Sequence, residues 1–139
     1  MTAIDANSFE LAHQMFADDI ASRAAGIEIA DLGEGHATAT MTVTERMVNG
    51  HGITHGGYVF LLADTTFALA CNSHGDRAVA ARADIRYLRP TRLGETLTAV
   101  AAERIRFGRN GIYDVTVTDE QQNVIAEFRG DSRVVPTTS

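Results

Sequence analysis

Asp64 is the residue whose surroundings point most directly to chemistry. It lies in a stretch from Gly57 to Asn72 whose apolar residues fall on nearly every side of a helix, which predicts a buried helix. A carboxylate buried without a partner is costly, or its pKa is raised. Asp64 therefore accepts a structural hydrogen bond, lies at an exposed edge, or acts in a cleft as a nucleophile or general base.

The segment before this helix supplies a complementary feature. His55-Gly56-Gly57 ends an irregular, glycine-rich stretch and opens the helix. A helix N-terminus has free N–H groups and a partial positive charge, and glycine lets a ligand approach the backbone closely. Amide donors aimed at a carbonyl oxygen that gains negative charge form an oxyanion hole. The simpler interpretation is an ordinary turn at a helix start.

The spacing of these two features has a consequence for assembly. Gly57 and Asp64 are seven residues apart, so they lie on nearly the same helix face but about 10 Å apart along the axis. Asp64 cannot touch a carbonyl held at the start of its own helix. An antiparallel second copy of the helix would bring it opposite Gly56 and Gly57. If both features act together, the protein is at least a dimer with two equal sites at the interface.

The rest of the chain predicts a helix followed by a run of strands. Apolar residues from Phe9 to Ile20 recur at helical spacing, with Ser8 as N-cap and Gly26 after the end. Alternating or apolar stretches predict strands near 27–32, 37–43, 78–89, 95–106, 111–119 and 123–134. An antiparallel sheet packed on one long buried helix is an α+β architecture, here in one domain covering residues 1–139.

Composition excludes several classes of protein. With 139 residues and a net charge of −6, the chain is not a general nucleic-acid binder. Its single cysteine excludes an intrachain disulfide, and no apolar run is long enough to span a membrane, so we expect a soluble cytoplasmic protein. All 12 cations are arginines, concentrated in the second half of the chain. They form either a solvated sheet face or a docking surface for an anionic small molecule.

Two motifs together resemble a known family. The runs Asn49-Gly50-His51-Gly52-Ile53-Thr54-His55-Gly56-Gly57 and Leu62-Ala63-Asp64-Thr65 resemble the hotdog-fold acyl-CoA thioesterases, most of all those of phenylacetate degradation. The similarity continues through Tyr87-Leu88-Arg89-Pro90 and Gly111-Ile112-Tyr113-Asp114-Val115 and covers nearly the whole chain. It implies a curved antiparallel sheet wrapped around a long central helix. It also implies an acyl-CoA substrate, no metal or redox cofactor, and homodimers that pair into tetramers.

The resemblance also implies roles for individual residues. Asp64 matches the catalytic acid, and Gly56 matches the glycine whose amide polarises the thioester carbonyl, with Gly57 beside it. His55 and Asn49 match residues that orient the thioester or the attacking water. The expected substrate-binding residues are Tyr87 and, at the nucleotide part of coenzyme A, Arg106, Gly108, Arg109, Asn110 and Arg133.

The expected reaction is hydrolysis of an aryl-acyl-CoA thioester of the phenylacetyl-CoA or hydroxyphenylacetyl-CoA type. Asp64 either attacks the carbonyl carbon, giving a mixed anhydride, or activates water. One alternative is a hotdog-fold enoyl-CoA hydratase, which uses an Asp-x-x-x-x-His pair, but Leu69 occupies the histidine position. The other is a non-catalytic acyl-CoA-binding module, which gains nothing from a buried carboxylate.

Overall fold

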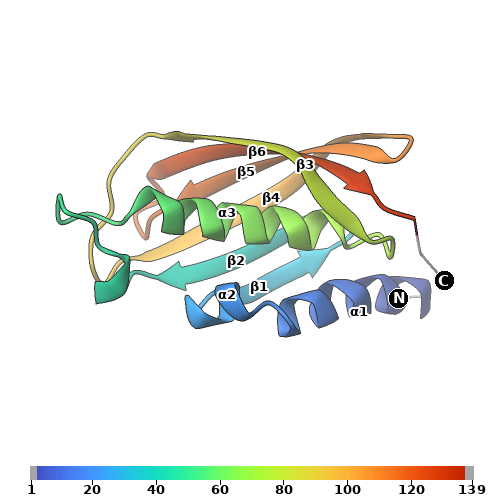
Figure 1. The fold of residues 1–139 in the computed structure, drawn as a ribbon, viewed down its shortest axis with the longest axis horizontal. Helices are drawn as coiled ribbons and strands as arrows, with labels where there is room; N and C mark the ends of the chain where they lie inside the picture. Colours follow the sequence, from blue (N-terminus) through green and yellow to red (C-terminus); the bar gives the residue numbers. More distant parts are fainter. Residues whose placement is uncertain (1–2, 137–139) are drawn as a thin grey trace.

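The structure, a computed structural model, describes residues 3–136 and contains one six-stranded antiparallel sheet. The sheet curves around a long helix, α3 (Gly56–Cys71), as Figure 1 shows, and the expected α+β hotdog architecture is confirmed. In spatial order its strands are β1 (Glu28–Gly33), β2 (His36–Thr42), β4 (Thr96–Phe107), β5 (Asn110–Thr118), β6 (Val124–Val134) and β3 (Ala78–Tyr87).

The core lies between α3 and the concave face of the sheet. Along β5, every second residue from Gly111 to Val117 is buried, which is the period of a strand with one face covered. Phe67 of α3 packs against Phe128 and Tyr113. A Cβ at Gly130 would lie 2.7 Å from the Phe67 ring, so glycine there lets the helix come close to β6. All six strands lie within about two residues of their predicted positions.

The N-terminal region differs from the prediction. The single helix expected from Ser8 onward is two helices, α1 (Ala3–Ala17) and α2 (Ile20–Ala24), and Ser8 lies inside α1 rather than at its cap. The break occurs because the Asp19 carboxylate accepts a hydrogen bond from the Ser22 N–H at 2.9 Å and starts a new helix. Ile20 is consequently 82% exposed instead of facing the core.

Two features of the fold bear on the site. The segment that joins β2 to α3 contains a short 3₁₀ turn, η1 (Glu45–Met47), and an irregular loop. Strand β3 forms one edge of the sheet, and most of its residues are exposed. Among the described residues, no helix is both long enough and apolar enough to cross a membrane.

Candidate active site

The N-terminus of α3 is capped by a side chain that leaves one amide open. His55 is the N-cap residue, and its Nδ1 accepts a hydrogen bond from the Gly57 N–H at 2.9 Å. The Tyr58 N–H is satisfied by the His55 carbonyl. The Gly56 N–H has no acceptor among the described residues. Of the two glycine amides that the sequence analysis singled out, Gly56 is therefore the one free to bind a ligand oxygen.

Tyr87, the last residue of β3, contacts the carbonyl side of Gly56. Its hydroxyl donates to the Gly56 carbonyl at 2.9 Å. A Cβ at Gly56 would lie 3.1 Å from both Cζ and the hydroxyl oxygen of Tyr87. A Cβ at position 56 would therefore fit only if the exposed tyrosine ring shifted by a few tenths of an ångström. Burial raises the pKa of Tyr87, so its hydroxyl remains a donor at neutral pH.

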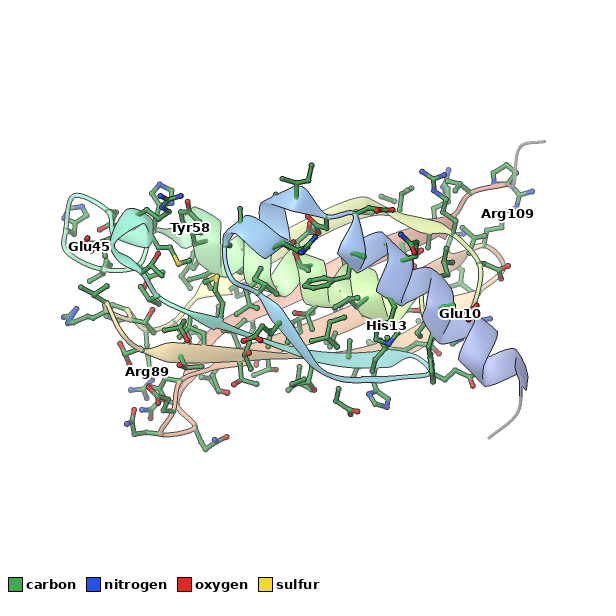
Figure 2. All side chains as sticks on the ribbon, turned by 90° about the horizontal axis from the view of Figure 1, so that it is seen from below. Glu10, His13, Glu45, Tyr58, Arg89 and Arg109 are labelled. Atoms are coloured by element: carbon green, nitrogen blue, oxygen red, sulfur yellow. The ribbon has the colours of Figure 1, made fainter. Side chains whose placement is uncertain are left out.

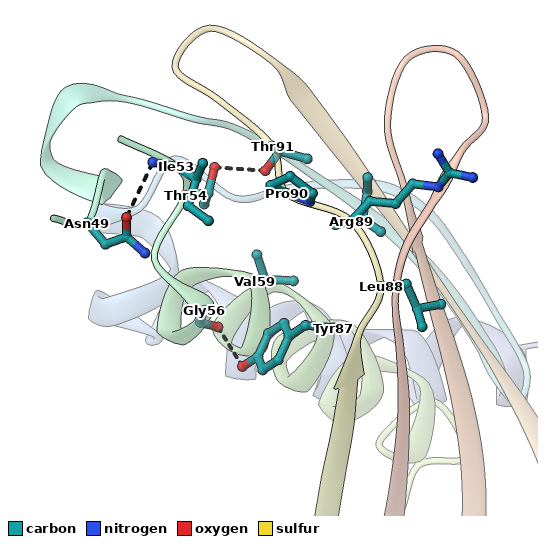
Figure 3. A pocket seen from close by; sticks show the side chains of 11 residues that line it. Asn49, Ile53, Thr54, Gly56, Val59, Tyr87, Leu88, Arg89, Pro90 and Thr91 are labelled. Carbon is teal, nitrogen blue, oxygen red and sulfur yellow. Dashed lines mark hydrogen bonds between the residues drawn. The ribbon is translucent and has the colours of Figure 1, made fainter. Parts of the chain in front are cut away.

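Asn49 shapes the loop on the other side of Gly56. Its Oδ1 accepts from the His51 N–H at 2.9 Å and the Ile53 N–H at 3.3 Å, which fixes the loop before the helix. The amide nitrogen makes no hydrogen bond with a described residue, and Figure 3 shows it on the side of Gly56. Asn49 can thus offer a second donor near the Gly56 N–H.

These groups border a hollow of about 380 Å³. Its walls come from the loop before α3, the first turn of α3, the segment that follows β3, and β6 (Figure 3). The lining residues are Asn49, Ile53, Thr54, Gly56, Val59, Tyr87, Leu88, Arg89, Pro90, Thr91 and Ile125. The arrangement can hold a carbonyl oxygen against backbone and amide donors in mostly apolar surroundings.

A second hollow of about 530 Å³ lies on the other side of the same helix turn. Its lining is mostly apolar and comes from α2, η1 and α3, with Arg46 and His55 as its polar members. The remaining residues are Ala21, Ala24, Ala25, Gly57, Tyr58 and Leu61. Gly56 thus faces one hollow and Gly57 the other.

Asp64 lies two turns further along α3 and does not line either hollow. The carboxylate is half-buried and forms no hydrogen bond with a described residue. It belongs to a stripe of α3 with Gly57, Leu61 and Ala68 that the rest of the chain covers only in part. Burial, and to a smaller extent the negative charge of Asp19, raises the pKa of Asp64. Within one chain, the structure does not bring Asp64 and Gly56 together.

The neighbouring Thr65 is structural. Its hydroxyl is buried and lies 2.7 Å from the Ser22 hydroxyl, which in turn donates to Asp19 at 2.6 Å. This chain of hydrogen bonds fastens α2 to α3.

Four of the five residues expected at the nucleotide come together at the opposite end of α3. Arg106, Gly108, Arg109 and Asn110 belong to the β4–β5 hairpin and border a small cavity of about 160 Å³ with Cys71 and His74. Figure 2 shows Arg109 at the end of the molecule opposite Tyr58. Arg133 does not line this cavity, because the preceding Ser132 faces inward and Arg133 is exposed on the outer side of β6.

A hydrogen-bonded group beside this cavity was not anticipated from the sequence. His74 Nε2 lies 2.6 Å from Glu103 Oε1, and the Tyr113 hydroxyl donates to the same oxygen at 3.1 Å. The three residues belong to a turn, β4 and β5, so no local spacing could have connected them. Leu88, Arg89 and Thr91, which line the first hollow, were missed as lining residues for the same reason.

The described residues contain no group of three or more side chains able to hold a metal ion. The polar groups around the start of α3 include backbone amides, Asn49, His55 and Tyr87, while the carboxylate of Asp64 lies apart from them.

Several known proteins are similar to this chain. Residues 51–126 match the thioesterase superfamily model. The acyl-coenzyme A thioesterase PaaI of Escherichia coli is 46% identical over 131 residues, which are 94% of each chain. The solved structure of the E. coli PaaI protein has a TM-score of 0.93 and 44% identity, covering 98% of this chain and 99% of that one. A Streptococcus mutans structure bound to acetyl-CoA has a TM-score of 0.77 and 28% identity, covering 81% of this chain and 91% of that one.

The family match covers more than half of the chain, and the E. coli relative aligns over nearly all of it. The chain belongs to the thioesterase superfamily and is an acyl-CoA thioester hydrolase.

Proposed function

We propose that this thioesterase hydrolyses aryl-acyl-CoA thioesters at a site shared by two copies of the chain. The observation that carries the proposal is the Gly56 N–H, which stays without an acceptor beside a hollow at the N-terminus of α3. A thioester carbonyl bound there develops its negative charge against this amide and the positive end of the helix. Asn49 offers a second donor, and His55 and Gly57 hold the turn that presents the amide.

The carboxylate comes from the partner subunit. Asp64 and Gly56 are eight residues apart on one helix, which is about 12 Å along its axis and too far for one carbonyl to reach both. The stripe of α3 that holds Asp64 is partly exposed, and the edge strand β3 has unpaired backbone groups on one side. A two-fold axis beside β3 sets two α3 helices antiparallel, so that Asp64 of the partner subunit faces Gly56. Two such dimers then form the tetramer that the resemblance implies.

The chemistry can follow either of two balanced routes. Asp64 of the partner subunit takes a proton from water while the water oxygen bonds to the carbonyl carbon, or its own oxygen bonds to that carbon. The resulting tetrahedral oxyanion lies against the Gly56 N–H. Its collapse breaks the C–S bond, and the CoA thiolate leaves and takes up a proton. The second route leaves a mixed anhydride that water then hydrolyses.

The hollow beside Gly57 supports an aryl-acyl group as the substrate. Three alanines, Leu61 and Tyr58 give it small and apolar walls next to His55. The relative with 44% identity is named as a protein of the phenylacetic acid degradation operon, which makes phenylacetyl-CoA and its ring-hydroxylated forms the first candidates. In an antiparallel dimer, the nucleotide of CoA extends toward the cavity of the partner's Arg106 and Arg109.

Complementation between two inactive variants tests the shared site. Asp64→Asn removes the carboxylate charge. Gly56→Pro removes the N–H, and proline suits this position because Gly56 is the first helical residue and His55 has an extended conformation with φ −60° and ψ 131°. We expect each variant alone to lose at least about 100-fold in kcat and to keep binding a non-hydrolysable acyl-CoA analogue.

Co-expression of the two variants restores activity if each site uses both chains. Random pairing leaves about a quarter of the sites with an intact Gly56 and an intact Asp64 from its partner, so about a quarter of the parental activity returns. A site contained in one chain would give no recovery and would refute the shared arrangement. Release of free thiol from phenylacetyl-CoA, hydroxyphenylacetyl-CoA, acetyl-CoA and a long-chain acyl-CoA tests the substrate class. A preference for acetyl-CoA or the long chain would overturn it.

A further inference from the structure

A single peptide group separates the two hollows at the start of α3. The Gly56 carbonyl and the Gly57 N–H are the two ends of this group. Gly56 lines the hollow of about 380 Å³ together with Tyr87, and Gly57 lines the hollow of about 530 Å³ together with His55. Tyr87 and His55 therefore lie in different hollows but contact the same peptide group.

Hydrogen bonds connect the two side chains through this peptide. The Tyr87 hydroxyl donates to the Gly56 carbonyl at 2.9 Å, and the Gly57 N–H donates to His55 Nδ1 at 2.9 Å. A donor at a peptide carbonyl polarises the group and strengthens its N–H as a donor, as in other chains of hydrogen bonds. Tyr87 therefore strengthens the bond that holds the imidazole ring.

This bond decides which nitrogen of His55 carries the proton. A neutral imidazole has one donor nitrogen and one acceptor nitrogen, and the hydrogen bond at one of them selects the tautomer. Because Nδ1 accepts from Gly57, the proton of neutral His55 is on Nε2. His55 is exposed and lines the larger hollow, so its Nε2–H is available to a ligand there.

We propose that Tyr87 is a positioning residue that fixes the ring orientation and the Nε2–H tautomer of His55 through the Gly56–Gly57 peptide. The resemblance implies a substrate-binding role for Tyr87, whereas the positioning role needs no contact with substrate. The contact at Gly56 supports it, because the ring packs against position 56 so closely that a Cβ there would lie 3.1 Å from it. The effect on turnover rests on the role that the resemblance implies for His55, which is to orient the thioester or the attacking water, while the effect on the tautomer does not.

Tyr87→Phe is the variant that tests the role, because it keeps the ring and removes only the hydroxyl. Nitrogen-15 NMR of the histidine side chains reports the tautomer directly. We expect the parental His55 to show an unprotonated Nδ1 and a protonated Nε2, and the variant to show a mixture of tautomers. Tyr113→Phe is the matched control, since it removes a tyrosine hydroxyl that bonds to Glu103 at the far end of α3 and should leave the His55 signals unchanged.

Kinetics then separate positioning from general stability. We expect Tyr87→Phe to lower kcat about fivefold and to change KM less than about twofold, because ground-state binding is retained. His55→Asn keeps an N-cap acceptor but has no tautomer. In the His55→Asn background, Tyr87→Phe should lower kcat less than about 1.5-fold, since Tyr87 is proposed to act through His55.

An unchanged His55 tautomer in Tyr87→Phe would overturn the proposal. So would an equal loss of kcat in the parental and His55→Asn backgrounds, which would mean that the tyrosine acts elsewhere. A changed tautomer with an unchanged kcat would keep the positioning role and instead refute the function proposed for His55.

Discussion

The two ends of α3 are built in opposite ways. At the C-terminal end, Asn72 closes the helix: its side chain donates to the carbonyls of Ala68 and Ala78 and accepts from the Ala78 N–H. At the N-terminal end, His55 satisfies only part of the first turn and leaves the Gly56 N–H open. A helix normally has its terminal groups satisfied by caps or water, so the open end marks where a ligand is expected.

The polar groups also differ between the two ends. At the N-terminal end the polar groups are peptide groups and the side chains of Asn49, Tyr87 and His55, and each of these side chains is held by a hydrogen bond of 2.9 Å. The cavity at the C-terminal end has Arg106, Arg109 and Asp76 in its lining. Fixed dipoles suit a charge that appears only during a reaction, because they need no reorganisation. Guanidinium groups suit the permanent charge of a phosphate. The contrast supports our proposal that the reaction takes place at the N-terminal end of α3 and that the nucleotide binds at the C-terminal end.

Among the substitutions that test the contrast between the two ends of α3, removal of the Gly56 N–H should lower kcat the most. Gly56→Pro and Gly56→Ala add a similar Cβ next to the Tyr87 ring, but only alanine keeps the N–H. We therefore expect kcat of the proline variant to lie about 10²–10³-fold below that of the alanine variant. Steady-state hydrolysis of phenylacetyl-CoA measures the ratio.

Gly50→Ala is the control for changes in the loop, since nothing lies within 4 Å of a Cβ added there. It should keep kcat within about twofold of the parent. Equal activities of the proline and alanine variants would show that the Gly56 N–H takes no part in the reaction.

Removing an arginine at the other end should affect binding more than turnover. For Arg106→Ala, we expect the KM for an acyl-CoA to rise about tenfold at low salt, with kcat within about twofold, because one phosphate contact is lost. The KM for the corresponding acyl-pantetheine thioester, which lacks the nucleotide, should not change.

Arg104→Ala is the matched control on the same strand, because Arg104 is exposed and does not line the cavity. The same measurement with Arg133→Ala examines the fifth residue expected at the nucleotide, for which we predict a smaller rise in KM. A loss of kcat with an unchanged KM in Arg106→Ala would contradict the proposal that the C-terminal end of α3 binds the nucleotide and takes no part in the reaction.

The smallest effect is expected from a substitution of Asp19, whose negative charge acts on the Asp64 carboxylate. In the proposed mechanism Asp64 acts in its charged form, and the negative charge of Asp19 contributes to raising its pKa. Asp19→Asn removes that charge and keeps an N-cap for α2. The pKa of Asp64 should fall, so the acid limb of the pH profile of kcat should move to lower pH while the plateau stays within about twofold.

Asp18→Asn provides the control, because this exposed carboxylate has no role in the pKa of Asp64. A shift of the acid limb to higher pH in Asp19→Asn, or no shift at all, would show that another group governs it.

Local patterns predicted most of the framework. The alternation from Tyr113 to Val117 predicted β5, because it has the two-residue period of a strand. The length of the apolar segment from Gly57 onward, with apolar residues on nearly every side, predicted α3 as a buried helix. The first helix was predicted less well. Its apolar spacing runs through to Ile20, but the side chain of Asp19 caps a new helix and ends the pattern early. The local hydrogen bond between Asp19 and Ser22 therefore outweighed the helical spacing of the apolar residues.

The sequence by itself determined that a helix begins at a His-Gly-Gly turn and that a carboxylate lies two turns along it. The tertiary structure alone decided what surrounds these groups. Tyr87 meets Gly56 from 31 residues away, and His74 meets Glu103 and Tyr113 at the other end of the helix. The reason is physical: backbone geometry fixes the period within one element, whereas contacts between elements depend on the strand order that places β3 next to β6.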